Sequence, residues 1–77
     1  MFNYEAEYWN ERKNKMTKDN DTFDNVFDLL DAIKDDFNAP RKNGYIPKMT
    51  VSEDDDGDIT VVIVQELSQH MAKKLGL

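Results

Sequence analysis

The stretch Ser52–Val64, SEDDDGDITVVIV, places four aspartates around one glycine and continues into a run of β-branched residues. Valine, isoleucine and threonine favour strands, and Asp56-Gly57 tolerates the positive φ angles of a two-residue hairpin turn. We therefore predict a β-hairpin over residues 48–64, with Val51 opposite Val62. The second strand is apolar on both faces. It needs cover from helices on one side and from further chain or a second subunit on the other.

A calcium-binding loop is the alternative explanation of these aspartates. An EF-hand loop has glycine at position 6 and a bidentate glutamate at position 12. If Gly57 occupies position 6, position 1 is Ser52 and position 12 is Ile63, which has no oxygen to offer. The turn explains the same residues without these defects, so we predict no metal ligand and no cofactor.

The chain before the hairpin is predicted to be helical. Phe2, Ala6, Trp9 and Met16 follow a helical stripe to about residue 17. A second helix follows, with Asn20 or Asp21 as its N-cap and its end at Asn38 and Pro40. Its apolar residues recur at three- and four-residue steps and are Phe23, Val26, Phe27, Leu30, Ile33 and Phe37.

The carboxyl-terminal segment completes the predicted fold. Leu67, Met71 and Leu75 recur every four residues, which is typical of a short amphipathic helix. The fold class is thus predicted as α+β, in the order α-α-β-β-α, within a single small acidic domain of residues 1–77. Its parts are a helical pair (1–38), a linker (39–47), a β-hairpin (48–64) and a C-terminal helix (65–77).

The composition of the chain restricts the expected cellular compartment and the expected class of binding partner. The 77 residues include no cysteine, which fits a reducing compartment such as the cytoplasm. The N-terminal segment is interrupted by Glu5, Glu7 and Glu11, so no signal peptide or membrane span is predicted. The net charge is −6, and residues 19–36 hold seven aspartates against one lysine. Such a field repels nucleic acid and anionic membranes and attracts basic protein surfaces.

The acids of the second predicted helix form a row. Taking about 100° per residue, they fall within one quarter of the helix surface. Like charges at this spacing destabilise a helix by about 0.2–0.5 kcal/mol per pair, so a helix selected for stability alone would mix lysines among them. The row is either a solubilising coat or a set of phosphate surrogates. Its members are Asp21, Asp24, Asp28, Asp31 and Asp35.

A short resemblance favours the second interpretation. The segment NVFDLLDAI, Asn25–Ile33, resembles segments of phage-encoded acidic anti-restriction proteins, which are helical DNA mimics that block host enzymes acting on DNA. The resemblance implies a phage origin, action in the host cell cytoplasm and evasion of host defence. It brings no catalytic or ligand motif to this chain.

Two hypotheses for function follow. The first is a non-enzymatic inhibitor that mimics nucleic-acid phosphates and masks the basic surface of a DNA- or RNA-binding host protein. The second is a small assembly or adaptor subunit that binds through its apolar hairpin and N-terminal aromatics. A homodimer is compatible with both. His70 is the only histidine, and no triad can be built around it. The candidate partner-binding residues are Asp21, Asp24, Asp28, Asp31, Asp35, Glu53, Asp54, Asp55, Asp56, Asp58, Tyr4 and Tyr8.

Overall fold

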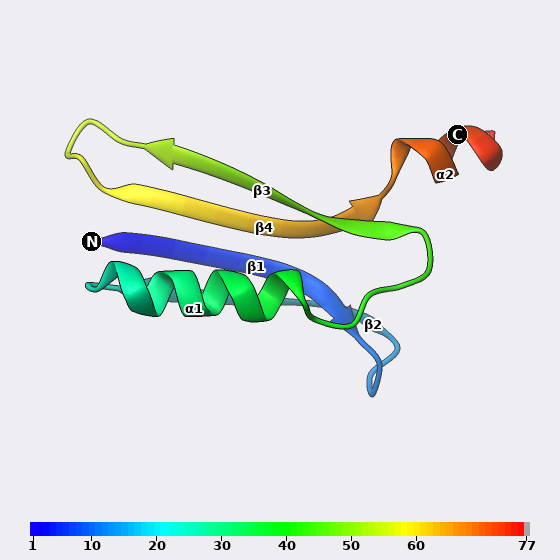
Figure 1. The fold of residues 1–77 in the computed structure, drawn as a ribbon, viewed down its shortest axis with the longest axis horizontal. Helices are drawn as coiled ribbons and strands as arrows, with labels where there is room; N and C mark the ends of the chain where they lie inside the picture. Colours follow the sequence, from blue (N-terminus) through cyan, green and yellow to red (C-terminus); the bar gives the residue numbers. More distant parts are fainter. Residues whose placement is uncertain (77) are drawn as a thin grey trace.

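The computed structural model describes residues 1–76 and shows a mixed sheet with one long helix. The N-terminus, the sheet and the helix are seen in Figure 1. The elements, in chain order, are β1 (Phe2–Asn10), β2 (Lys15–Phe23), α1 (Val26–Phe37), β3 (Tyr45–Glu53), β4 (Ile59–Leu67) and α2 (Gln69–Lys74).

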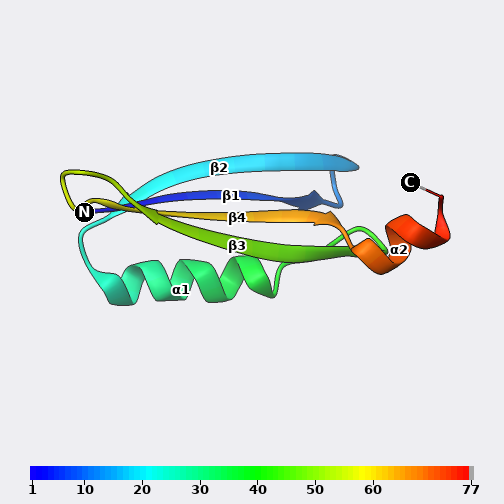
Figure 2. The same ribbon diagram turned by 90° about the horizontal axis from the view of Figure 1, so that it is seen from above.

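The sheet is built from two hairpins joined side by side. Its strand order is β2-β1-β4-β3, with β1 and β4 parallel at the centre and each hairpin antiparallel. The register pairs Phe2 with Ile59 and Ala6 with Ile63. The helix α1 packs against β1, β2 and β4, and Figure 2 shows it on one side of the sheet with no helix on the other side. The molecule is elongated, measuring 42 × 28 × 16 Å.

The core lies between α1 and the central strands. Alternate residues of β1 and β4 point to the helix side, as the two-residue period of a strand requires. Tyr4 and Phe23 meet edge to face, with their ring centroids 5.9 Å apart. Further apolar side chains from β1, β2, α1 and β4 pack around this centre. The buried apolar residues are Tyr4, Ala6, Leu29, Val61 and Ile63.

The predicted order α-α-β-β-α is wrong, because the observed order is β-β-α-β-β-α. Residues 2–23, predicted to be helical over most of their length, form the β1–β2 hairpin. The helical stripe was a coincidence of spacing, since Phe2, Ala6 and Trp9 lie on β1 whereas Met16 lies on β2. The stronger signal was the strict alternation of Phe2, Tyr4, Ala6 and Tyr8 with polar residues.

The second predicted helix exists but begins later and buries a different face. Its N-cap is Asn25, whose side chain accepts a hydrogen bond of 2.7 Å from the Phe27 amide, so neither Asn20 nor Asp21 has this role. Leu29 is its buried residue, whereas Phe27 and Leu30 are exposed. Of the predicted apolar face, Phe23 and Ile33 pack against the core, whereas Val26, Phe27, Leu30 and Phe37 are exposed.

The second hairpin is confirmed as a hairpin but differs in register. A three-residue loop replaces the two-residue turn, because Gly57, at φ 84°, forms the bulge position after a turn closed by its hydrogen bond to the Asp54 carbonyl. One extra loop residue shifts the pairing by one, so Val51 lies opposite Val61. Val62 consequently points to the face opposite α1.

The remaining predicted boundaries also move. The linker predicted over 39–47 ends earlier, since β3 begins at Tyr45, and the strands extend to Leu67 instead of 64. The C-terminal helix is confirmed only over Gln69–Lys74, with Ser68 as N-cap. Within residues 1–76, none of the helices has the length and apolar character that a membrane crossing needs.

Candidate protein-binding surface

An acidic cleft lies between α1 and the edge strand β2. It has a volume of about 330 Å³, and its wall includes carboxylates from both elements. On β2 these are Asp19 and Asp21, which point to the helix side because they pair with Ala6 and Tyr4. On α1 they are Asp35 and Asp36. The strand and the helix together therefore gather four carboxylates around one depression.

Two tyrosines of β1 anchor two of these carboxylates to the fold. The Tyr4 hydroxyl donates to Asp36 and to the Ala32 carbonyl oxygen, 3.2 Å away. Burial and the Asp36 carboxylate raise the pKa of Tyr4 well above its usual range. The Tyr8 hydroxyl donates to Asp19 at 2.9 Å, and this hydrogen bond raises the pKa of Tyr8. Asp36 of α1 and Asp19 of β2 thus accept hydrogen bonds from side chains of β1.

The tyrosines themselves differ as candidate partner contacts. Tyr4 is only 6% exposed, so it belongs to the core and offers no surface to a partner. Tyr8 is half-buried, and its hydroxyl is engaged by Asp19. Their contribution to the surface is to hold the carboxylates of Asp36 and Asp19 in place.

The predicted row of five aspartates is divided among three segments. Asp28, Asp31 and Asp35 are exposed on α1, Asp24 precedes the N-cap, and Asp21 is a strand residue facing the cleft. Because the row crosses from helix to strand, it is broader than a single helical stripe. Among residues 1–76, none of the ion pairs includes these five side chains. The pairs are Met1–Asp58, Lys18–Glu5 and Lys48–Glu66.

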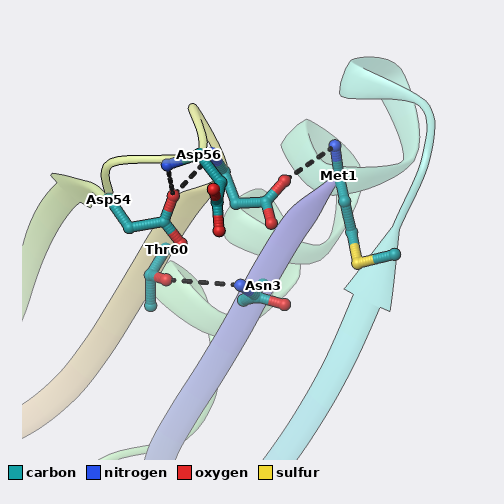
Figure 3. A network of polar contacts seen from close by, with 6 residues as sticks. Met1, Asn3, Asp54, Asp56 and Thr60 are labelled. Atoms are coloured by element: carbon teal, nitrogen blue, oxygen red, sulfur yellow. Dashed lines mark hydrogen bonds and ion pairs between the residues drawn. The ribbon is translucent and has the colours of Figure 1, made fainter.

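The second acidic group is the β3–β4 loop. One Asp54 carboxylate oxygen accepts from the amides of Asp56 and Asp58, at 2.9 and 3.0 Å, and so holds the loop closed (Figure 3). Asp58 lies 3.7 Å from the amino group of Met1. The side chains of Glu53, Asp55 and Asp56 are exposed. Asp54 therefore has a structural task, whereas Asp55 and Asp56 point their charge to solvent.

The charges are separated along the long axis of the molecule. The β3–β4 loop, Asp24 and the start of α1 lie at one end, which we call the acidic end (Figure 1). The β1–β2 turn, the segment between α1 and β3, and α2 lie at the other, which we call the basic end. Its basic residues are Arg12, Lys13, Lys15, Arg41, Lys42, Lys73 and Lys74.

The chemistry available to this surface is charge recognition. Among residues 1–76 no group of three or more His, Cys, Asp or Glu side chains is arranged to hold a metal ion. His70 is exposed on α2. Spaced carboxylates can accept hydrogen bonds from ammonium and guanidinium groups, which is how proteins bind basic surfaces.

Sequence reasoning missed Asp19 and Asp36 as members of this surface. Asp19 lies two residues from Thr17 and from Asp21, and four from Phe23. In a strand this two-residue period places all four on one face, the face that Phe23 turns to the core. Nothing in the sequence pairs Asp36 with Tyr4, because the two are 32 positions apart. Comparison with protein-family models, curated proteins and solved structures gives no match.

Proposed function

We propose that the protein is a non-enzymatic, phage-type inhibitor. Its acidic surface takes the place of nucleic-acid phosphates and masks the basic groove of a DNA- or RNA-binding host protein. The observation that carries this proposal is the exposed row of carboxylates on α1, which has no ion-pair partner among residues 1–76. A surface evolved only for solubility would gain stability from interspersed lysines.

Two rows of carboxylates support the proposal better than one. On α1, residues three or four apart rise about 5 Å along the helix axis, a lower charge density than one phosphate per ~3.4 Å of duplex axis on one DNA strand. Asp19 and Asp21 on β2 lie across the cleft from Asp35, which raises the charge density along this side. A basic groove that holds a nucleic acid would therefore contact carboxylates of both α1 and β2.

The acidic loop extends the same surface. It lies at the end of the molecule where α1 begins (Figure 1), so a partner that reaches Asp28 also comes near Asp55 and Asp56. Such a partner exchanges its own bound anions for these carboxylates, as it does when it binds DNA. Binding driven in this way is weakened by salt.

The test compares two triple variants that change the net charge equally. D28N/D31N/D35N neutralises the α1 row, and E7Q/E11Q/E66Q removes three acids outside it. Each protein is immobilised, exposed to bacterial extract and eluted with a sodium chloride gradient. Eluted proteins are then tested for DNA and RNA binding by fluorescence anisotropy.

We expect wild type and the E7Q/E11Q/E66Q control to retain a nucleic-acid-binding protein that elutes with salt and cannot bind nucleic acid while captured. The D28N/D31N/D35N variant should lose it. Equal retention by both triple variants would refute the phosphate-surrogate role of the row.

The adaptor hypothesis is the second candidate, and one observation favours it. Met49 and Val51 of β3 are exposed on the helix side of the hairpin. An adaptor that binds through them should lose its partner in a Val51→Asp variant and keep it in high salt. Elution only by denaturant, with no effect of the α1 triple variant, would favour this function over inhibition.

A further inference from the structure

The second flank of α1 exposes its largest apolar side chains. Leu29, which points to the sheet, is 4% exposed, whereas its neighbour Leu30 is 52% exposed and Phe27 is 71% exposed. Val26 and Phe37 are also exposed. A helix in a small monomeric domain normally turns such residues to the core, because burial of each is favourable. This flank is therefore unusual for a surface that meets only water.

Strand β3 continues the same apolar surface. Met49 and Val51 pair with Ile63 and Val61, so they share the helix side of the sheet with these two core residues. The core residues of β4 are nearly inaccessible, but Val51 is 59% exposed. Figure 1 shows why, since α1 lies in front of β1 and β2 and no element lies in front of β3.

The exposed flank of α1 is turned towards this uncovered strand. Ala32 and Asp35 line the cleft with β2, so that side of the helix is fixed. At about 100° per residue, Val26, Leu30 and Phe37 lie on the opposite side, towards β4 and β3. We define the apolar trough as Val26, Leu30 and Phe37 of α1 with Met49 and Val51 of β3.

The helix-side face of the sheet is wider than α1 alone can cover. Four strands spaced about 4.8 Å apart make a face that is wider than one helix, whose diameter with side chains is about 10 Å. In this molecule, α1 packs against β1, β2 and β4 and leaves only β3 uncovered. An added helix there needs an apolar flank of its own.

We propose that the trough is a homodimer interface, in which the α1 of a second copy lies antiparallel to α1 and covers β3. In a two-fold arrangement each copy offers Leu30, with Phe27 beside it, to the trough of the other, so Leu30 belongs both to the site and to the residues that fill it. The acidic flanks stay on the outer sides, because each faces its own β2.

The charge distribution favours a second copy of the chain as the occupant of the trough, in the antiparallel orientation. Each chain carries a net charge of −6, so a parallel pair would set two acidic ends side by side. An antiparallel pair places each acidic end next to the basic end of its neighbour. Charge complementarity of this kind fixes orientation at an interface, and apolar contact at the centre holds it.

The first experiment measures oligomeric state by sedimentation equilibrium over a range of protein concentrations. We expect wild type to dimerise, and Leu30→Asp to weaken dimerisation by more than about tenfold, as loss of a central anchor does. Leu75→Asp is the matched control, because Leu75 is 60% exposed but lies beyond α2, outside the trough. Circular dichroism checks that both variants are folded.

The second experiment tests the antiparallel arrangement with single cysteines, since the chain has none of its own. Val26 and Phe37 are at opposite ends of α1. Under oxidation, a mixture of Val26→Cys and Phe37→Cys should form the mixed disulfide, and neither variant alone should cross-link efficiently. Efficient cross-linking of each variant to itself would show a parallel pair and overturn the proposed arrangement.

A wild-type protein that stays monomeric at every concentration would overturn the dimer. So would a dimer that Leu30→Asp leaves intact. These outcomes are independent of the proposed inhibition, because the acids tested for that function lie on the other flank of α1.

Discussion

The two flanks of α1 differ in the free-energy cost of their exposure to water. One flank carries Asp28 and Asp35 beside the carboxylates of β2, and the other carries Leu30 and Phe37 beside the uncovered strand β3. Repulsion among carboxylates is reduced by water and salt, so the acidic flank is stable in isolation. Water offers no such relief to the apolar flank. The comparison teaches that the acidic flank costs little free energy in the unbound protein, whereas the apolar flank gains free energy when another surface covers it.

The largest expected effect tests which leucine anchors the helix between these flanks. Leu29→Ala should lower the free energy of unfolding by about 3 kcal/mol, because it leaves a cavity against the sheet. Leu30→Ala should change it by less than about 1 kcal/mol when the protein is dilute enough to be monomeric. Urea unfolding followed by circular dichroism measures both. The opposite ranking would support the helix face predicted from the sequence.

The next effect concerns the tyrosine beneath the acidic flank. Tyr4→Phe should cost about 1 kcal/mol at neutral pH, because it removes the hydroxyl that donates to Asp36 and Ala32. The pKa of Tyr4 is raised in the folded protein, so the neutral phenol stabilises the fold. That contribution is complete below the unfolded pKa of about 10 and is lost as the pH rises above it.

The measurement for Tyr4→Phe is urea unfolding of wild type and variant at neutral pH and again above the unfolded pKa. The difference in stability between the two proteins should shrink at the alkaline pH. A difference that does not change with pH would mean that the Tyr4 hydroxyl titrates normally, in conflict with its burial.

The smallest effect concerns the acidic flank itself. D28N/D31N/D35N removes two like-charge pairs at three- and four-residue spacing, so the free energy of unfolding should rise by a few tenths to about 1 kcal/mol. Asp28 lies in the first turn, where the helix dipole favours it, and this offsets part of the gain. Thermal and urea unfolding against E7Q/E11Q/E66Q give the comparison. A loss of stability would assign these acids a structural role.

The sequence was sufficient for those elements whose signals are local. The hairpin around Gly57 and the existence of α1 follow from turn chemistry and apolar spacing, and both are present. The N-terminal hairpin was missed because a few apolar residues fitted a helical period by chance, although the alternation from Phe2 to Tyr8 was regular.

The acidic surface was harder to predict because tertiary contacts assemble it. Five aspartates were assigned to one helix, but the sheet places Asp21 on a strand and brings Asp19 to the same cleft. Likewise, which flank of α1 is buried depends on contacts such as that of the Tyr4 hydroxyl with Ala32, across 28 positions of sequence. A period along one helix shows that it has two faces, and its neighbours decide which one is buried.

The parallel pairing of β1 with β4 also sets an order of events during synthesis. Asn3 and Thr60, which meet across this pair, are 57 positions apart, so the first strand leaves the ribosome long before its central neighbour. Until β4 emerges, β1 of the nascent β1–β2 hairpin lacks the strand that pairs with its other edge in the folded protein. Completion of the sheet is therefore a late, long-range step, and a stalled chain ending before β4 would be prone to aggregate.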